Sequence, residues 1–120
     1  KIFVSNRTQS KAYNIKNMFR EVEVVEWGTI PDFDMIINAT SLGLKDGENI
    51  NIDYSKIGSE KFFYDVIYNP SETSFLKTAK KLGNRIENGK RMFIYQAQAS
   101  FKIWNNLEPK IDNDVMELLN

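Results

Sequence analysis

The chain has 120 residues, 42% of them hydrophobic, which suffices for one compact core but not for two ordinary domains. Sixteen basic residues balance sixteen acidic ones, so the composition offers no broad electrostatic surface for nucleic acid or an anionic membrane. The absence of cysteine and histidine excludes disulfides, thiolate nucleophiles, imidazole acid–base catalysis and the usual zinc ligands. No apolar run approaches the roughly 20 residues of a membrane span, and no segment resembles a signal peptide, so we expect a cytoplasmic protein.

The first half of the chain predicts an alternation of strands and helices. Three short apolar runs have the composition of strands, at residues 2–5, 22–25 and 35–37. A helix is expected after Thr8, its predicted N-cap, because apolar residues then recur at helical spacing, at Ala12, Ile15, Met18 and Phe19. The third strand leads into the small polar residues 38–43, which indicate a loop.

The second half repeats this alternation. Strands are expected at residues 62–67 and 84–87, and helices at residues 73–82, 90–106 and 112–119. Pro70 stops the first of these strands, Thr73 opens the helix after it, and Gly83 ends that helix. The long helix carries one apolar stripe, formed by Ile94, Ala97, Phe101 and Trp104.

Such an alternation defines a fold class. It predicts an α/β fold with a Rossmann-like, mostly parallel sheet that is covered by helices on both faces. In sheets of this kind, ligands bind beyond the carboxyl ends of the strands. Three loops of this chain are expected there, at residues 6–11, 38–43 and 66–72.

Two cations occupy the first of these loops, where many dinucleotide-binding folds carry an acid. In dinucleotide-binding folds, an acid at the end of the fold's second strand binds the ribose hydroxyls of NAD, whereas a cation at that place suits the 2′-phosphate of NADP. Arg7 offers a planar guanidinium, Thr8 a hydroxyl, and Lys11 a second charge one turn further on. Cations at a helix start oppose the helix dipole, at a cost of about 0.3–1 kcal/mol each, which favours an anionic ligand. A solvated helix start without a ligand is the alternative.

Three further segments each admit a functional and a plain structural interpretation. The run IINATSLG lets a flat ring approach the backbone and offers hydroxyls at Thr40 and Ser41, but it also fits an ordinary turn. In YDVIYNPSET, Tyr64, Val66 and Tyr68 alternate, as core residues on one face of a strand also would. In ENGKRMFIYQAQASFKIW, the polar residues would face water if no ligand lies there.

Taken in series, four segments closely resemble the carboxyl-terminal domain of the shikimate dehydrogenases. They are SNRT, DMIINATSLGL, YDVIYNPSETSFL and NGKRMFIYQAQASFKIW, and the similarity extends from Ile2 to about Pro109. The resemblance implies that residues 1–120 are an NADP-binding, Rossmann-like domain of an oxidoreductase. That enzyme reduces 3-dehydroshikimate to shikimate with NADPH in aromatic amino-acid biosynthesis. Residues 111–120 are expected to pack toward its substrate-binding domain.

The resemblance also implies roles for individual residues. The implied cofactor-binding residues are Asn6, Arg7, Thr8, Lys11, Asn38, Ala39, Thr40, Ser41, Val66, Gly89 and Met92. Tyr68 and Gln96 match residues that reach the substrate. Two positions depart from the family pattern: Val66 is shorter than the residue often found there, and Lys11 replaces an arginine of some members, which gives a point charge in place of a fork.

No catalytic residue and no metal ligand is expected within this chain. In the family, a domain with a catalytic Lys–Asp pair, the first Rossmann strand and the Gly-rich pyrophosphate turn precede the segment that this chain resembles. We therefore expect an inactive fragment that is prone to self-association. The implied partner is a small molecule, shikimate or 3-dehydroshikimate, with neither nucleic acid nor membrane. Two alternatives stay open: a quinate/shikimate dehydrogenase paralogue that accepts quinate and NAD, and a non-catalytic nucleotide-binding module.

Overall fold

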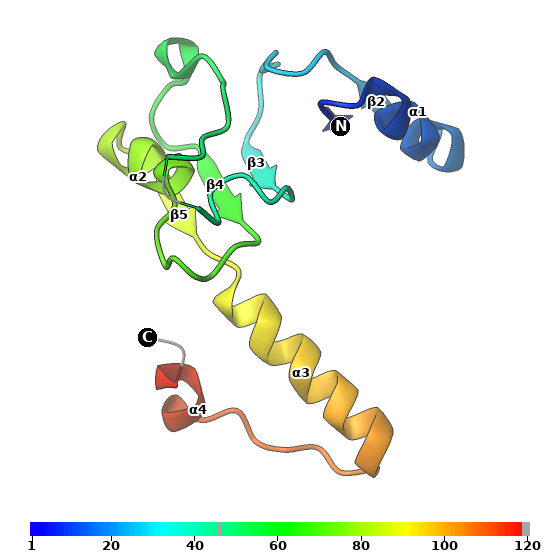
Figure 1. Cartoon of the computed structure of the whole chain (residues 1–120), viewed down its shortest axis with the longest axis vertical. Helices are drawn as coiled ribbons and strands as arrows, with labels where there is room; N and C mark the ends of the chain where they lie inside the picture. Colours follow the sequence, from blue (N-terminus) through cyan, green and yellow to red (C-terminus); the bar gives the residue numbers. More distant parts are fainter. Residues whose placement is uncertain (46, 119–120) are drawn as a thin grey trace.

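A computed structural model describes residues 1–45 and 47–118 of the chain (Figure 1). The strands are β1 (Ile2–Val4), β2 (Val22–Val24), β3 (Met35–Asn38), β4 (Phe62–Asp65) and β5 (Arg85–Glu87). The helices are α1 (Gln9–Met18), α2 (Ser74–Lys81), α3 (Lys90–Asn105) and α4 (Asn113–Glu117), and a 3-10 turn at Tyr54–Lys56 was not predicted. Each expected strand and helix is present, and residue 119 of the expected terminal helix lies outside the described residues.

All strand pairs are parallel, as predicted, but the described strands form two sheets. In the first, β1 pairs with β2, with Ile2 opposite Val22. In the second, β4 lies between β3 and β5, with Phe62 opposite both Met35 and Arg85. Helix α1 packs against β2, and α2 packs against β4 and β5. The predicted α/β class with parallel pairing is confirmed, and the sheet is divided between β1 and β3.

The main core lies between the three-stranded sheet and α2. Phe63 is fully buried in β4, and its ring centroid lies 5.2 Å from that of Phe75 and 5.8 Å from that of Phe33. Leu76 and Ala79 complete the buried cluster from α2. These α2 residues recur at helical spacing and therefore share one face of the helix, and this face packs against the three-stranded sheet.

The start of α1 differs in detail from the prediction. Thr8 is the N-cap residue, but its side chain makes no capping hydrogen bond; its backbone N–H donates to Oδ1 of Asn6 at 2.8 Å. Ala12 is buried, whereas Met18 and Phe19 are 69% and 53% exposed. Much of the predicted apolar stripe therefore lies at the surface, because a sheet of two short strands is too small to cover it.

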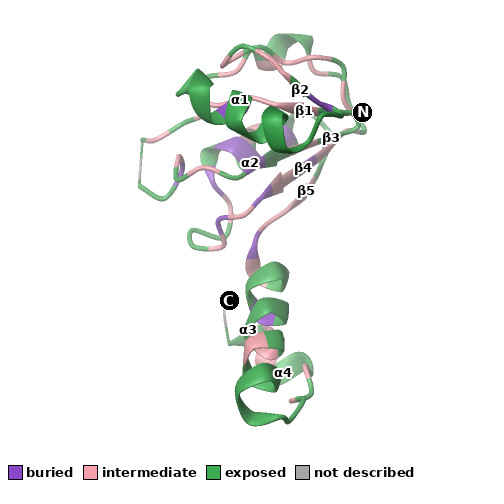
Figure 2. Ribbon diagram, turned by 90° about the vertical axis from the view of Figure 1, so that its right-hand side faces the viewer, coloured by how far each residue is buried: buried purple, intermediate pink, exposed green. Residues whose placement is uncertain are grey.

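Helix α3 runs away from both sheets (Figures 1 and 2). Ile94 is its buried residue, whereas Ile103 and Trp104 are 80% and 79% exposed. The stripe predicted on this helix thus packs mainly at Ile94. The structure exposes 8896 Å² in total, against about 6,700 Å² for a compact monomer of this mass. No helix in the described part of the chain has the length and apolar character that crossing a membrane requires.

The division of the sheet leaves one edge of β1 and one edge of β3 without a neighbouring strand among the described residues. Apolar side chains stand at both edges, with Ile2 58%, Met35 46% and Ile37 55% exposed. Unpaired backbone groups beside apolar side chains are a template for pairing with a further strand. From these two unpaired edges we expect the chain to associate with further copies of itself.

We predict that the purified 120-residue chain self-associates through these edges. Replacing Ile37 by Lys should return it to a monomer, because a charge on an edge strand opposes pairing. Sedimentation velocity measures the change. Ile103→Lys, on exposed α3, is the matched control and should leave the association intact. A monomeric wild-type chain, or a monomer produced by Ile103→Lys alone, would contradict the prediction.

Candidate functional site

A cavity of about 390 Å³ opens at the carboxyl ends of β3 and β4. Its lining residues are Thr40, Ser41, Leu44, Val66, Ile67, Tyr68 and Asn69. The first three form one wall and the last four the other, so the structure brings together two of the three loops that were expected to bind a ligand. The carboxyl edge of a parallel sheet is the usual place for such a site.

A second cavity, of about 450 Å³, lies near the amino ends of the same strands. Asp32, Phe33 and Lys61 are among its lining residues, and they precede β3 and β4 in the chain. Although it is larger, it contains none of the residues predicted for the site. We therefore assign the candidate site to the cavity at the carboxyl ends.

Asn38 organises the first wall from the end of β3, where it is 2% exposed. Its Oδ1 accepts hydrogen bonds from the backbone N–H and the hydroxyl of Thr40, at 3.0 and 2.8 Å. Its Nδ2 donates to the carbonyl of Leu42 at 3.1 Å. The hydroxyl proton of Thr40 is thus engaged within the wall, whereas Ala39 and Ser41 are exposed beside it.

Asp65 organises the second wall as a fully buried carboxylate at the end of β4. Its Oδ1 accepts from Nδ2 of Asn38 and from the N–H of Ile67, each at 3.0 Å. Its Oδ2 accepts from the hydroxyl of Thr73 at 2.6 Å, and Thr73 is also the N-cap of α2, accepting from the N–H of Leu76. One side chain therefore connects both walls with the start of α2.

Gly89 lies directly against the second wall. A Cβ at this position would lie 1.9 Å from the carbonyl oxygen of Val66, closer than any real contact. The N–H of Gly89 donates to the carbonyl of Ile67 at 3.1 Å. The preceding Asn88 donates from Nδ2 to the carbonyl of Ser71 at 2.9 Å. The start of α3 is therefore fixed to the loop after β4.

Of the predicted residues near α3, Tyr68 lines the cavity. Its ring centroid lies 4.8 Å from that of Phe93 on α3, with the two planes tilted by 30°. Met92 and Gln96 lie on exposed parts of the same helix, four residues apart, and they are not among the lining residues. The stacked ring of Tyr68 thus connects the cavity with the helix that carries them.

The remaining predicted residues lie on the other sheet, where β1 leads into α1. Arg7, Thr8 and Lys11 are exposed. Among the described residues, neither cation forms an ion pair, and the first turn of α1 contains no acid. The helix start therefore presents positive charge that no described carboxylate neutralises.

Burial acts on two tyrosines near the sheet. Desolvation and, to a smaller extent, the negative charge of Asp65 raise the pKa of Tyr54 to about 12. Desolvation and then Glu87 also raise the pKa of Tyr64. Both phenols stay protonated at neutral pH, and neither lines the cavity. In the part of the chain that the structure describes, no cluster of acidic residues is arranged to hold a metal ion.

The residues that support the two walls, Asp65, Thr73 and Asn88, were not predicted as part of the site, and neither were the lining residues Leu44, Ile67 and Asn69. A carboxylate within the apolar run FFYDVIY was the available signal for Asp65, because a strand buried on both faces rarely carries a charge without a purpose. Thr73 was recognised only as a helix start. Asn88 stands immediately before the predicted Gly89, but its partner Ser71 is 17 residues away, and sequence alone does not reveal that contact.

Parallel strands whose polar loops meet at their carboxyl ends place this chain in the class of Rossmann-like α/β domains. No protein-family model matches the sequence. Shikimate dehydrogenase (NADP(+)) of Pelagibacter ubique is 58% identical over 119 residues, which is 99% of this chain and 45% of the relative. The chain is homologous to the shikimate dehydrogenases, and the resemblance carried by its four motifs is confirmed.

Solved structures agree with this relationship. A shikimate dehydrogenase in complex with NADP+ matches with a TM-score of 0.84 and 36% identity, over 99% of this chain and 45% of that one. A quinate dehydrogenase of Corynebacterium glutamicum in complex with NAD matches with a TM-score of 0.82 and 30% identity, over 99% and 45%. This chain thus spans about half the length of the relatives that it matches.

The close approach at Gly89 predicts that Gly89→Ala destabilises the chain by about 1–3 kcal/mol. The added methyl group would overlap the Val66 carbonyl and displace either α3 or the cavity wall. Chemical denaturation measures the free energy of unfolding. Gly58→Ala is the matched control, because a Cβ there meets nothing within 4 Å. Equal stabilities of the two variants would show that α3 does not depend on this contact.

Proposed function

We propose that this chain is the NADP-binding part of a cytoplasmic shikimate dehydrogenase, and that the whole protein interconverts shikimate and 3-dehydroshikimate. The unneutralised positive start of α1, with Arg7 and Lys11, is the observation that carries the cofactor assignment. The 58% identity to an enzyme named as NADP-dependent supports it.

In this proposal, the two ends of the cofactor meet different sheets. Arg7 grips the 2′-phosphate with two parallel N–H groups, Lys11 adds a point charge, and Asn6 and Thr8 shape the turn between them. The 390 Å³ cavity, a volume within the range of small-molecule pockets, takes the nicotinamide end between residues 38–41 and Val66. Gly89 allows close approach at that end, and Met92 borders it.

Bound NADP supplies the acceptor for the substrate hydride, and the residues of this chain orient the reactants. Tyr68, held by stacking on Phe93, and Gln96 are proposed to contact the substrate hydroxyls from the α3 side. The chain itself provides no proposed catalytic acid or base. That role is assigned to the Lys–Asp pair of the domain that accompanies this one in the family, toward which residues 111–120 are proposed to pack.

A quinate dehydrogenase that uses NAD is the second candidate, because one of the matching structures has that name and that ligand. The two candidates differ at the adenosine ribose. A free 2′-hydroxyl gains nothing from two cations, whereas a phosphate does. The start of α1 therefore favours NADP. A non-catalytic nucleotide-binding module is the third candidate, and it would bind NADP without supporting turnover.

A chimera tests the proposed function. The chain should replace the matching 45% of the Pelagibacter enzyme and give NADP-dependent oxidation of shikimate, followed by the absorbance of the reduced nicotinamide. Shikimate and quinate are each assayed with NADP and with NAD. Faster turnover of quinate with NAD would favour the second candidate. A folded chimera that binds NADP but oxidises neither substrate would favour the third.

From the proposed contact between Arg7 and the 2′-phosphate, we predict that Arg7→Ala in this chimera raises the Kd for NADP about 10- to 150-fold. This is the equivalent of about 1.5–3 kcal/mol for a charge-assisted contact. Binding of NAD should hardly change, because NAD lacks the phosphate. Titration with each cofactor gives both constants. Arg20→Ala, beyond the other end of α1, should leave both unchanged. Equal weakening of NADP and NAD by Arg7→Ala would assign this residue a structural role instead.

A further inference from the structure

Asp65 is a buried ionisable group to which the proposed function gives no role. We infer that Asp65 is a positioning residue: through Asn38 and Thr73 it holds the two cavity walls in register, and with them the nicotinamide and the substrate. The inference rests on the proposed function for its effect on turnover. The contacts themselves involve only residues of this chain.

Each of the three hydrogen bonds to Asp65 comes from a different segment. Asn38 belongs to the first wall, Ile67 to the second wall, and Thr73 to the start of α2. No Lys or Arg among the described residues forms an ion pair with this carboxylate, so these donors are what stabilises its charge. A shift of either wall would remove a donor from a buried charge, and the network therefore resists such shifts.

The network extends from the carboxylate to residues that line the cavity. The Nδ2 of Asn38 donates to Asp65, and the Oδ1 of Asn38 accepts from the N–H and the hydroxyl of Thr40. On the opposite side, Ile67 is both a donor to Asp65 and a lining residue. Two lining residues from different walls, Thr40 and Ile67, are thus joined through two buried side chains, Asn38 and Asp65.

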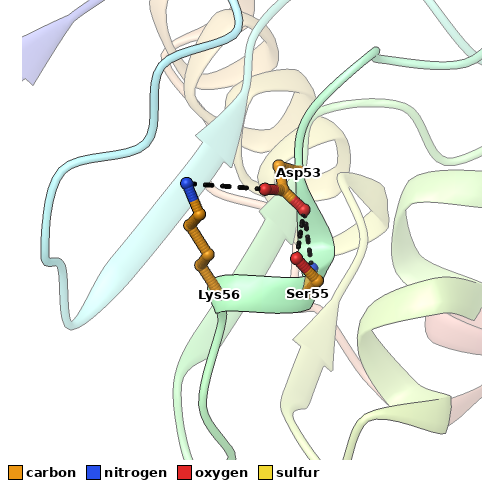
Figure 3. Close-up of polar contacts among 3 residues, drawn as sticks. All are labelled: Asp53, Ser55 and Lys56. Atoms are coloured by element: carbon orange, nitrogen blue, oxygen red, sulfur yellow. Dashed lines mark hydrogen bonds and ion pairs between the residues drawn. The ribbon is translucent and has the colours of Figure 1, made fainter.

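Asp53 provides a control that accepts the same kinds of hydrogen bond, from a backbone N–H and a hydroxyl, but at an exposed position (Figure 3). Its carboxylate accepts from the N–H of Ser55 at 3.0 Å and from the hydroxyl of Ser55 at 2.5 Å. The hydroxyl and then the N–H of Ser55 hold the pKa of Asp53 below its usual range. All of these contacts stay within one turn, together with the ion pair to Lys56 at 3.8 Å. Asp53 therefore connects no two walls.

The first test uses the 120-residue chain without ligand. In Asp65→Asn, a neutral side chain of the same shape replaces the carboxylate, and native-state hydrogen exchange of the Thr40 and Ile67 amides should become at least tenfold faster. The Arg85 amide, which donates to the carbonyl of Lys61, should change less than twofold. Asp53→Asn should change none of the three rates. Uniform acceleration of all three amides in Asp65→Asn would indicate general destabilisation and overturn the inference.

The second test uses the chimera described above, at a temperature where each variant is folded. Asp65→Asn should lower kcat at least tenfold and weaken the binding of NADP and of NAD alike, because the nicotinamide half of either cofactor lies between the walls; the ratio of the two Kd values should change less than threefold, because the contact with the 2′-phosphate lies on the other sheet. Thr73→Ser keeps the hydroxyl and should retain kcat within threefold, whereas Thr73→Val should reproduce the loss. Asp53→Asn should have the activity of the unmutated chimera.

The outcomes separate the inference from the proposed function. An unmutated chimera without turnover would refute the proposed function, while the exchange rates of the chain alone would still show whether Asp65 couples the walls. An active chimera in which Asp65→Asn keeps its kcat would overturn the inference alone. The same conclusion would follow if Thr73→Ser and Thr73→Val lost activity equally, because the hydroxyl would then not matter.

Discussion

The hydrogen bonding of one buried carboxylate is the constraint on which the larger sheet depends. An ionised carboxylate without partners would cost several kcal/mol in the interior, and each charge-assisted hydrogen bond returns about 1.5–3 kcal/mol. Asp65 is fully buried, and its donors come from β3, from the loop after β4 and from the start of α2. The end of the strand, the cap of the helix and the turn after β3 must therefore form together. This requirement places two polar loops face to face and creates the cavity between them.

The contact between Gly89 and Val66 adds a second constraint, which acts on the direction of α3 and not on the spacing of the cavity walls. Because the backbone of Gly89 lies against the Val66 carbonyl, α3 must leave the sheet at the cavity. The helix then extends beyond the sheets, with most of its apolar residues exposed. The same contact that brings Phe93 beside Tyr68 at the cavity thus contributes to the large surface of the chain.

Local features of the fold could be predicted from the sequence, and features that depend on distant partners could not. Apolar runs and caps are local signals, which is why the five strands in the described part of the chain and the cap at Thr73 were found. The bond between Asn38 and Asp65 joins residues 27 apart, and no periodicity reveals it. The division of the sheet likewise depends on which strand pairs with β1 and β3. The apolar stripes of α1 and α3 predicted the helices correctly, but spacing alone does not say whether a stripe meets a partner.

The proposed site is divided in the same way as the sheet, and this division bears on affinity. Arg7 and Lys11 lie beside the β1–β2 sheet, whereas the cavity lies at the other sheet. The residues between the two sheets, 25–34, are held in part by an exposed ion pair between Lys61 and Asp32 at 3.3 Å. Such surface pairs contribute at most about 1 kcal/mol. If the contact with the 2′-phosphate were the sole source of binding free energy, its contribution of about 3 kcal/mol would correspond to a Kd no tighter than millimolar. Tight binding therefore requires both halves to engage one ligand at once, since the first contact raises the effective concentration of the second. Whatever fixes β1 relative to β3 consequently sets the affinity for the cofactor as much as Arg7 does.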